Sequence, residues 1–267
     1  MLSRNLVKKT FFAPFVLLMV VIATAFPAAG YANPITPAYL YVVPAPLWTD
    51  TTETDGIDSV MIAPVALKIS LNKHVAGYVN SYLQREDEFL QKMKSKSGKY
   101  FKTIEKVFDQ YGIPPQLKYL AIVESELRSN AKSRVGARGM WQFMHETATD
   151  LGLRIAGKTD ERLHFYRSTV AAAKYLRYLH EQFDDWLLVL AAYNGGPGKV
   201  YTAIKKSGSK NFWALQRYLP AESRGHVKRF ISIHYFFEGE GSIATQTRAE
   251  AKAWQEKLSA EEVACVQ

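Results

Sequence analysis

Apolar positions recur with helical spacing from about residue 65 to residue 240, without alternating strand-like runs or internal repeats. The first predicted helix covers about 65–96 and ends at Ser97-Gly98, and the second covers 100–111. The third begins at the Pro114-Pro115 pair, because proline is tolerated in a first helical turn. Further helices are expected over 140–150, 169–183 and 186–193, from Pro197 to Gly208, and after Asn211 and Pro220. The pattern predicts an all-α domain, in which a small hairpin would escape notice.

Capping residues support two of these helices. Ser168 is expected to be the N-cap of the helix over 169–183, and Asp184 or Asp185 is expected to be the N-cap of the helix over 186–193. A side-chain oxygen at such a position can accept a free backbone N–H group of the first turn. The second of these helices is apolar on almost all sides, which predicts a central position in the domain. Asn194-Gly195-Gly196 is expected to end it.

Glu124 interrupts the apolar face of the third helix. A rotation of about 100° per residue places Leu117, Leu120, Ala121 and Leu127 in one stripe, and Glu124 falls inside it. A buried, unpaired carboxylate is costly and tends to stay protonated, and a carboxyl group that is neutral near pH 7 can act as a general acid. Glu124 is therefore the candidate catalytic acid. The alternative is a solvated glutamate at the rim of the core.

Small and polar residues cluster directly after this glutamate. A substrate groove beside the carboxyl group would need such residues, because they allow close approach and hydrogen bonding. The members of the cluster are Ser125, Ser133, Gly136, Gly139, Trp141, Gln142 and Met144.

Residues 1–32 have the pattern of a secretory signal peptide. Three basic residues precede an apolar run of about 16 residues, Phe11–Phe26, and small residues follow at 28–32. The run is shorter than the roughly 20 residues of a membrane-spanning helix. We expect cleavage after Gly30 or Ala32 and an exported, periplasmic protein, whereas an uncleaved segment would hold it at the membrane. Residues 33–64 then form an irregular arm, 65–240 the domain and 241–267 a polar tail.

Charge and cysteine content narrow the choice of partner. The formal net charge is +9, and removing the three basic residues of 1–32 leaves +6, which favours an anionic partner such as a cell-wall polymer or lipid headgroups. The basic residues are scattered and no nucleic-acid motif accompanies them, so nucleic-acid binding is not expected. Cys265 is the single cysteine and cannot form an intrachain disulfide. No His/Cys cluster is visible, and neither a metal nor a cofactor is expected.

Three separated motifs resemble the signatures of lytic transglycosylases of the goose-lysozyme-like (SLT) superfamily. They are ES at 124–125, SRVGARGMWQFM at 133–144 and AAYNGG at 191–196. The flanking GIPPQLKYLAIVES and the YLPAESRGHVKRF at 218–230 resemble the branch of membrane-bound lytic murein transglycosylase D. The resemblance covers about residues 65–240 and implies a lysozyme-like helical domain with a substrate groove.

The resemblance also implies a reaction. The enzyme would cleave the β-1,4 bond between N-acetylmuramic acid and N-acetylglucosamine in peptidoglycan and leave a 1,6-anhydro ring. Glu124 would first be the acid and then the base, so that the second carboxyl group of ordinary glycosidases is unnecessary. Glu126 points about 200° away from Glu124 around the helix and so cannot be this second carboxyl group. Glu146 is the nearest other candidate for it, although Glu146 could instead be an ordinary solvated helix residue.

The matching motifs assign five further residues to substrate binding. Ser133 would hydrogen-bond near the sugar or the carboxyl group, or only cap the loop. Gln142 would bind an N-acetyl or hydroxyl group, rather than being a solvated amide. Met144 would form part of the saccharide floor, or pack in the core. Tyr193 and Asn194 would face the groove near Glu124, or Asn194 would only cap its helix.

Two positions depart from the family pattern. His145 stands where many relatives have proline, so the helix there could start differently. His226 stands where the closer branch usually has tyrosine, near the active groove, which puts substrate contacts there in question, although an imidazole can still donate a hydrogen bond.

Two other functions compete with this one. The same scaffold could carry out lysozyme-type hydrolysis, which leaves a reducing muramic acid end and no anhydro ring. The chain could instead be a non-catalytic glycan-binding scaffold, which would have no need for a buried acid.

Overall fold

The computed structural model describes residues 68–265, and both the signal peptide predicted for residues 1–32 and the arm predicted for residues 33–64 lie outside them. The described part is built from helices and one short hairpin. Its α-helices are α1 (Lys73–Arg85), α2 (Asp87–Gln110), α3 (Leu120–Ser125), α4 (His145–Asp150), α5 (Phe165–Phe183), α6 (Trp186–Gly195), α7 (Pro197–Ser207), α8 (Phe212–Leu215), α9 (Ala221–Glu238) and α10 (Arg248–Cys265). Four 3₁₀ turns connect them, η1 (Pro115–Tyr119), η2 (Glu161–Leu163), η3 (Gln216–Tyr218) and η4 (Ile243–Thr245). The all-α prediction is confirmed.

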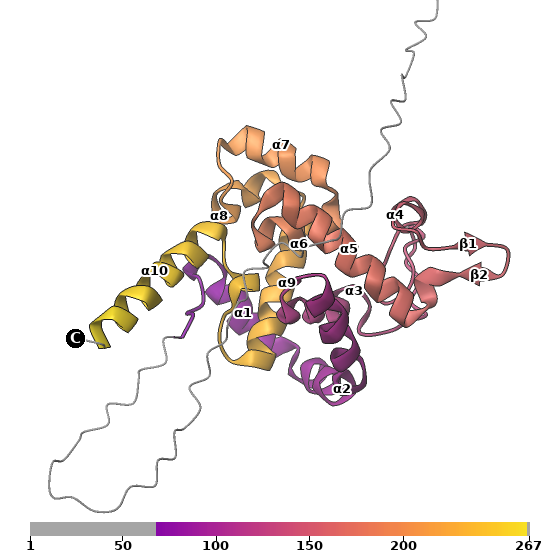
Figure 1. The fold of residues 1–267 in the computed structure, drawn as a ribbon, viewed down its shortest axis with the longest axis horizontal. Coiled ribbons are helices and arrows are strands. Elements are labelled where there is room, and N and C mark those ends of the chain that lie inside the picture. The colour runs from indigo at the N-terminus through magenta and orange to yellow at the C-terminus, as the bar shows by residue number, and fades with distance from the viewer. Residues whose placement is uncertain (1–67, 266–267) are drawn as a thin grey trace, which may run out of the picture. The chain divides into compact units, whose positions relative to one another are not determined.

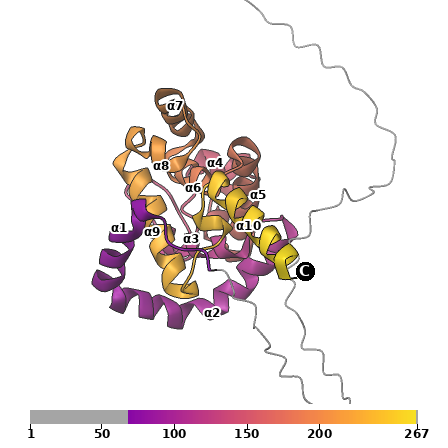
Figure 2. The same cartoon turned by 90° about the vertical axis from the view of Figure 1, so that its left-hand side faces the viewer.

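α6 is the central helix. It packs against α5, α7 and α9, as Figure 1 shows. Its first seven residues, from Trp186 to Ala192, are all buried, as the apolar sequence predicts. α9 in turn packs against α1 and α3, and Figure 2 shows α1 and α9 side by side. α9 therefore connects the central helix to the helix that carries Glu124.

The hairpin consists of β1 (Ile155–Ala156) and β2 (Thr159–Asp160), an antiparallel pair in which Ile155 faces Asp160. It follows α4 and lies outside the helices that the sequence predicts. Two residues per strand are too few to produce an alternating pattern. Of the described helices, none combines the length and the apolar character that a membrane span requires.

The first two predicted helices are divided at a different place. The break lies at Glu86, and α2 continues through Ser97-Gly98 without interruption. The expected stop at Gly98 is wrong because a glycine inside a helix costs only about 1 kcal/mol. Burial of the α2 face, which includes Leu90 and Phe101, outweighs that cost.

Two other predicted helix starts are also displaced. α5 begins at Phe165 with His164 as its N-cap, whereas Ser168 lies inside the helix and donates its hydroxyl to the His164 carbonyl at 2.9 Å. The helix predicted from residue 140 starts only at His145. His145 thus occupies the first helical position, where proline is readily accommodated. The helix starts at this position with histidine in place of the expected proline.

Asp185 caps α6 as predicted. Its Oδ1 accepts the backbone N–H groups of Leu187 and Leu188 at 3.0 and 3.1 Å, and its Oδ2 accepts that of Arg248 at 2.8 Å. Burial nevertheless raises the pKa of Asp185 to about 6, since desolvation outweighs these three hydrogen bonds. Arg248 begins α10, so the cap also connects the C-terminal helix to the core.

The raised pKa of Asp185 predicts a pH-dependent stability. Because the folded state binds this proton more tightly than the unfolded chain, the free energy of unfolding should fall as pH rises from about 4 to about 6. Over this pH range, the free energy of unfolding of the wild type should fall by up to about 3 kcal/mol relative to that of Asp185→Asn. Urea unfolding at several pH values measures the difference. Asp184→Asn, at the adjacent exposed position, is the control and should follow the wild type.

The start of the predicted polar tail packs onto the domain. Ala244 and Thr245 of η4 are buried, and Glu250 of α10 accepts the indole N–H of Trp213 at 3.2 Å. Glu250 also accepts the hydroxyl of Thr247 at 2.8 Å. These contacts continue the packed structure past residue 240, where the sequence predicts that the domain ends.

Candidate active site

Glu124 lies in the last turn of α3, inside the apolar stripe that the sequence predicts. Leu117, Leu120, Ala121 and Leu127 are buried, and the Glu124 side chain is only 12% exposed. The helix stops directly after it, because the two residues that follow Ser125 have left-handed backbone conformations. Glu124 therefore lies in the predicted stripe with its side chain mostly but not fully covered, and the core position of its four neighbours is confirmed.

Ser125 supports the turn that follows α3. Its hydroxyl oxygen accepts the backbone N–H of Arg128 at 3.1 Å, and the hydroxyl donates to the Ala121 carbonyl at 3.3 Å. These bonds satisfy backbone groups that the end of a helix leaves free. As expected, Ser125 holds the backbone next to Glu124.

The nearest polar partner of Glu124 is His226 of α9, 102 residues away in the sequence. The imidazole Nε2 lies 2.8 Å from Glu124 Oε1, and the His226 side chain is only 2% exposed. Nδ1 of the same ring is buried and has no hydrogen-bond partner in the described part of the chain.

The unpartnered Nδ1 indicates which nitrogen of His226 carries the proton. A neutral imidazole protonated at Nε2 leaves only a lone pair at Nδ1, whereas any other form would bury an unpaired N–H. His226 therefore donates from Nε2 to Oε1 of Glu124. Among residues 68–265, no other hydrogen bond reaches the Glu124 carboxyl group, so Oε2 remains available to an incoming group.

Tyr193 lies near this pair at the end of α6. Its hydroxyl donates to the Trp141 carbonyl at 2.9 Å. Burial raises the pKa of Tyr193 well above its ordinary value, and the negative charge of Glu124 is the next largest cause. The phenol therefore stays neutral and close to the candidate acid. Trp141 itself is fully buried, which confirms that it belongs to the core.

Asn194 connects α6 to α9. Its Oδ1 accepts the hydroxyl of Ser223 at 2.9 Å. Beside it, a Cβ atom on Gly195 would lie 2.5 Å from the same Ser223 oxygen, so a side chain at position 195 would displace the hydroxyl that binds Asn194. Ser223 precedes His226 by one turn of α9. The end of α6 therefore sets the position of the histidine that contacts Glu124.

The loop over 133–143 brings the remaining candidates together. Ser133 accepts the backbone N–H of Ala137 at 2.9 Å and thus holds the loop, and its expected contact with sugar stays a prediction. Gln142 has φ of +50° and donates its amide to the Gly139 carbonyl at 2.7 Å. Such a conformation is costly for a residue other than glycine and often marks a functional site. Met144 is 45% exposed, which rules out a core role.

Arg162 organises this loop, and the sequence patterns did not single it out. The guanidinium is buried and donates to the carbonyls of Gly136 and Phe143, both at 3.2 Å. It also pairs with Asp160 at 2.8 Å and holds the pKa of that carboxyl group below its ordinary value. Arg162 lies in a stretch that reads as a polar loop, and only packing shows that its charge is buried.

Gly139 makes the closest approach in the loop. Its φ is +81°, and a Cβ atom there would lie 1.9 Å from the Arg162 carbonyl oxygen. We expect Gly139→Ala to lower the free energy of unfolding by more than about 3 kcal/mol, because both the backbone at residue 139 and the neighbouring turn η2 would have to move. Chemical denaturation measures the loss. Gly136 also has a positive φ, but a Cβ atom there would meet no other atom within 4 Å. Gly136→Ala should therefore lower the free energy of unfolding clearly less than Gly139→Ala.

Comparison with known proteins places this site in a family. Residues 102–216 match the Transglycosylase SLT domain, a range that includes Glu124, Tyr193 and Asn194 but ends before His226. The chain is 32% identical over 167 residues to membrane-bound lytic murein transglycosylase D of Escherichia coli K12, which covers 61% of this chain and 36% of that protein. It is 31% identical over 126 residues to the soluble lytic murein transglycosylase of Salmonella typhimurium, covering 44% of this chain and 19% of that one.

Among solved structures, the 70 kDa soluble lytic transglycosylase of Escherichia coli aligns with a TM-score of 0.46 and 29% identity, over 54% of this chain and 26% of that one. The chain thus spans little more than a third of the length of the transglycosylase D that it matches. The sequence relationship confirms the resemblance carried by the three motifs. Residues 102–216 therefore match a Transglycosylase SLT domain, and the chain is similar to lytic murein transglycosylases over this part and its flanks.

Proposed function

We propose that this protein is a peptidoglycan lytic transglycosylase that cleaves the β-1,4 bond between N-acetylmuramic acid and N-acetylglucosamine and forms 1,6-anhydromuramic acid ends. The observation that carries the proposal is the single, nearly buried carboxyl group of Glu124, held by His226 and lying close to Tyr193. The named relatives are murein transglycosylases, which supports the same substrate class.

One carboxyl group performs both proton transfers in this reaction. Glu124 gives a proton to the glycosidic oxygen as the bond to C1 breaks. The resulting carboxylate then takes the proton of the C6 hydroxyl while O6 bonds to C1. The enzyme returns to its starting state, and no water is consumed. Since His226 donates to Oε1, the proton that moves is carried by Oε2.

The neighbouring carboxyl groups support this one-acid reaction. Ordinary glycosidases place a second carboxyl group across the bond, where it attacks carbon or activates water. Glu126 is 49% exposed and pairs with Arg128 at 3.4 Å, and Glu146 is exposed in the first turn of α4. Both nearest candidates therefore face solvent, whereas the internal C6 hydroxyl replaces the second group.

The other site residues would bind the sugar. The exposed Met144 offers an apolar surface to a sugar ring. The polar candidates Tyr193, Gln142, Ser133 and Asn194 each already have a partner in the free protein, so they would bind sugar only in addition to these bonds or by exchanging them. No cofactor takes part in the proposed reaction.

Product analysis tests the proposed function. Purified sacculi treated with the protein should release muropeptides that end in a 1,6-anhydro ring. Because no water is added to the cleaved bond, each of them should be about 18 Da lighter than the corresponding hydrolysis product. Mass spectrometry distinguishes the outcomes. Reducing muramic acid ends would indicate a lysozyme-type hydrolase, and binding without any release would indicate a glycan-binding scaffold.

The proposed substrate requires export. The signal-peptide pattern at residues 1–32 and the basic composition support a periplasmic protein that works on the anionic cell wall. N-terminal sequencing of the protein from the periplasmic fraction should begin at Tyr31 or Asn33, in accordance with cleavage after Gly30 or Ala32. A chain that keeps residues 1–32 and sediments with membranes would instead support an anchored form.

A further inference from the structure

The middle of α2 carries a dense run of lysines. The run lies between Phe89 and Ile104 and contains no acidic residue, and its members are Lys92, Lys94, Lys96, Lys99 and Lys102. The acidic residues of this helix are confined to its two ends and are Asp87, Glu88, Glu105 and Asp109. The middle of α2 is therefore strongly positive.

Three of these lysines lie opposite the buried face of the helix. At about 100° per residue, Lys92, Lys99 and Lys102 fall within about 80° of one another, and all three are exposed. Leu90 and the other buried residues of α2 point toward the core. Because α2 continues through Gly98, the three lysines share one face of a single helix. Figure 2 shows α2 along an edge of the described part, so this basic stripe, Lys92, Lys99 and Lys102, faces solvent.

The positive charge of the run is not compensated within the described part of the chain. None of the five lysines forms an ion pair with a carboxylate there. Glu105, which follows Lys102 by three residues, pairs instead with Lys118 at 2.6 Å. Lys96 donates to a backbone carbonyl, that of Glu126, at 2.6 Å. An uncompensated row of charges attracts an anionic partner.

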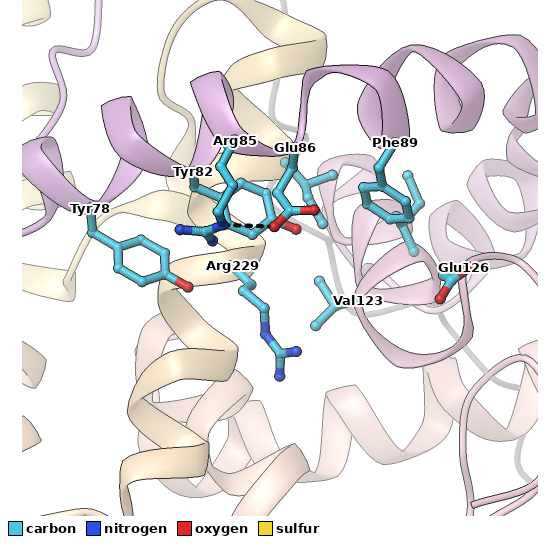
Figure 3. A pocket seen from close by; sticks show the side chains of 10 residues that line it. Tyr78, Tyr82, Arg85, Glu86, Phe89, Val123, Glu126 and Arg229 are labelled. Carbon is cyan, nitrogen blue, oxygen red and sulfur yellow. Dashed lines mark hydrogen bonds and ion pairs between the residues drawn. The ribbon is translucent and has the colours of Figure 1, made fainter.

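The pocket at the start of α2 does not share this excess charge. Figure 3 shows Arg85 and Arg229 on its lining, together with Glu86 and Glu126. Arg85 pairs with Glu86 at 2.9 Å, and two positive and two negative groups leave the lining without net charge. The uncompensated charge therefore lies further along α2, outside this pocket.

The stripe is also separate from the candidate active site. Lys92 and Lys99 precede the matched range of 102–216, and Lys102 is the first residue of that range. Within residues 68–265, none of the three forms a hydrogen bond or an ion pair with a residue of the site. Cleavage of sugar therefore does not account for the stripe.

The chemistry of the stripe suits an extended anionic surface. A lysine ammonium group is a hydrated point charge on a flexible stem, whereas single anions are bound best by guanidinium forks or converging N–H groups. From Lys92 to Lys102 the charges span about 15 Å along the helix axis. Anionic lipid headgroups present closely spaced and mobile charges over such a length, and each lysine near them adds to the attraction.

Exposed apolar side chains lie near the stripe. Tyr100, which follows Lys99, contacts Phe165 at the start of α5, with the ring centroids 5.3 Å apart. Within two residues of Phe165, Leu163 and Tyr166 are 36% and 51% exposed. Tyrosine and aliphatic side chains near lysines are typical of surfaces that lie against lipid headgroups. They favour a membrane over a soluble anion as the partner.

We propose that the basic stripe of α2 binds the domain to the surface of a membrane that contains anionic lipids. The apolar face of α2 is buried in the core, so the helix does not insert. Binding is electrostatic and reversible, and salt weakens it. The inference is independent of the proposed reaction, and it would hold the candidate active site at the membrane surface rather than free in solution.

Vesicle binding tests the inference. The chain from residue 33 to residue 267, which contains the whole described part, is sedimented with vesicles of phosphatidylcholine alone or mixed with phosphatidylglycerol. We expect binding to the mixed vesicles only, with release at high salt because salt screens exposed charges. The triple variant Lys92→Gln, Lys99→Gln, Lys102→Gln should bind the mixed vesicles at least about 30-fold more weakly. Its thermal unfolding should match that of the wild type, since the three side chains are exposed.

A second triple variant, Lys199→Gln, Lys205→Gln, Lys206→Gln, is the matched control. It removes the same charge from exposed positions of α7. Two of its lysines lie in the last turn, where the negative end of the helix dipole partly offsets them. This variant should bind the mixed vesicles within about threefold of the wild type.

Four results would overturn the inference. They are no binding of the wild type to the mixed vesicles, unchanged binding of the α2 variant, equal losses in the α2 and α7 variants, and a larger loss of binding to purified sacculi than to vesicles in the α2 variant. Equal losses would reduce the effect to net charge, and the last result would assign the stripe to the wall polymer. None of these measurements requires product release, so a failure of the proposed reaction is detected separately.

Discussion

Glu124→Gln should abolish the release of anhydromuropeptides from sacculi, with a loss in kcat of at least about 1,000-fold, the upper range for removal of a general acid. Glutamine has nearly the same shape, and its carbonyl oxygen can still accept the Nε2 proton of His226. What it lacks is a proton that it can give to the glycosidic oxygen. Liquid chromatography with mass spectrometry measures the loss.

The controls for this prediction separate chemistry from folding and binding. Circular dichroism and thermal unfolding of Glu124→Gln should match the wild type, and the variant should still sediment with sacculi. Glu126→Gln removes a carboxylate two residues away that is 49% exposed, and it should keep activity within about twofold. Activity of Glu124→Gln within a few-fold of the wild type would exclude Glu124 as the acid.

His226→Leu should lower kcat by about 10- to 100-fold while KM changes by less than about threefold. Leucine fills a similar volume but donates nothing to Glu124 Oε1, so the carboxyl group is no longer oriented with Oε2 toward the substrate. His226→Gln is the matched variant, since its amide can donate from almost the same place. It should retain a kcat within about fivefold of the wild type.

The comparison of the two variants distinguishes this positioning role from a structural one, because only glutamine can still donate a hydrogen bond to Glu124 Oε1. Equal losses of kcat in His226→Leu and His226→Gln would show that His226 acts only through packing.

The resemblance leads us to expect tyrosine at position 226, whose hydroxyl group would likewise be a hydrogen-bond donor. In this chain the imidazole Nε2 donates to the candidate acid at 2.8 Å. A donor is thus kept at this position although the side chain differs.

Local signals in the sequence determined most of the helices and the candidate acid. The Asp185 cap, Pro197, Asn211 and Pro220 each mark a helix start that the structure reproduces, because caps and prolines act on neighbouring backbone groups. The helical period alone placed Glu124 in a buried stripe, and the structure agrees. Where packing opposed a local signal, as at Gly98 inside α2, the local prediction failed.

Only the tertiary structure decided which groups meet around that acid. The approach of α6 to α9 at Gly195 and Ser223 brings His226 to Glu124 across 102 residues, and the burial of Arg162 fixes the loop beside them. Periodicity describes one segment at a time and holds no information on which surfaces pack together. The sequence therefore identified the candidate acid, whereas its hydrogen-bond partner and its free oxygen depend on the packing of distant helices.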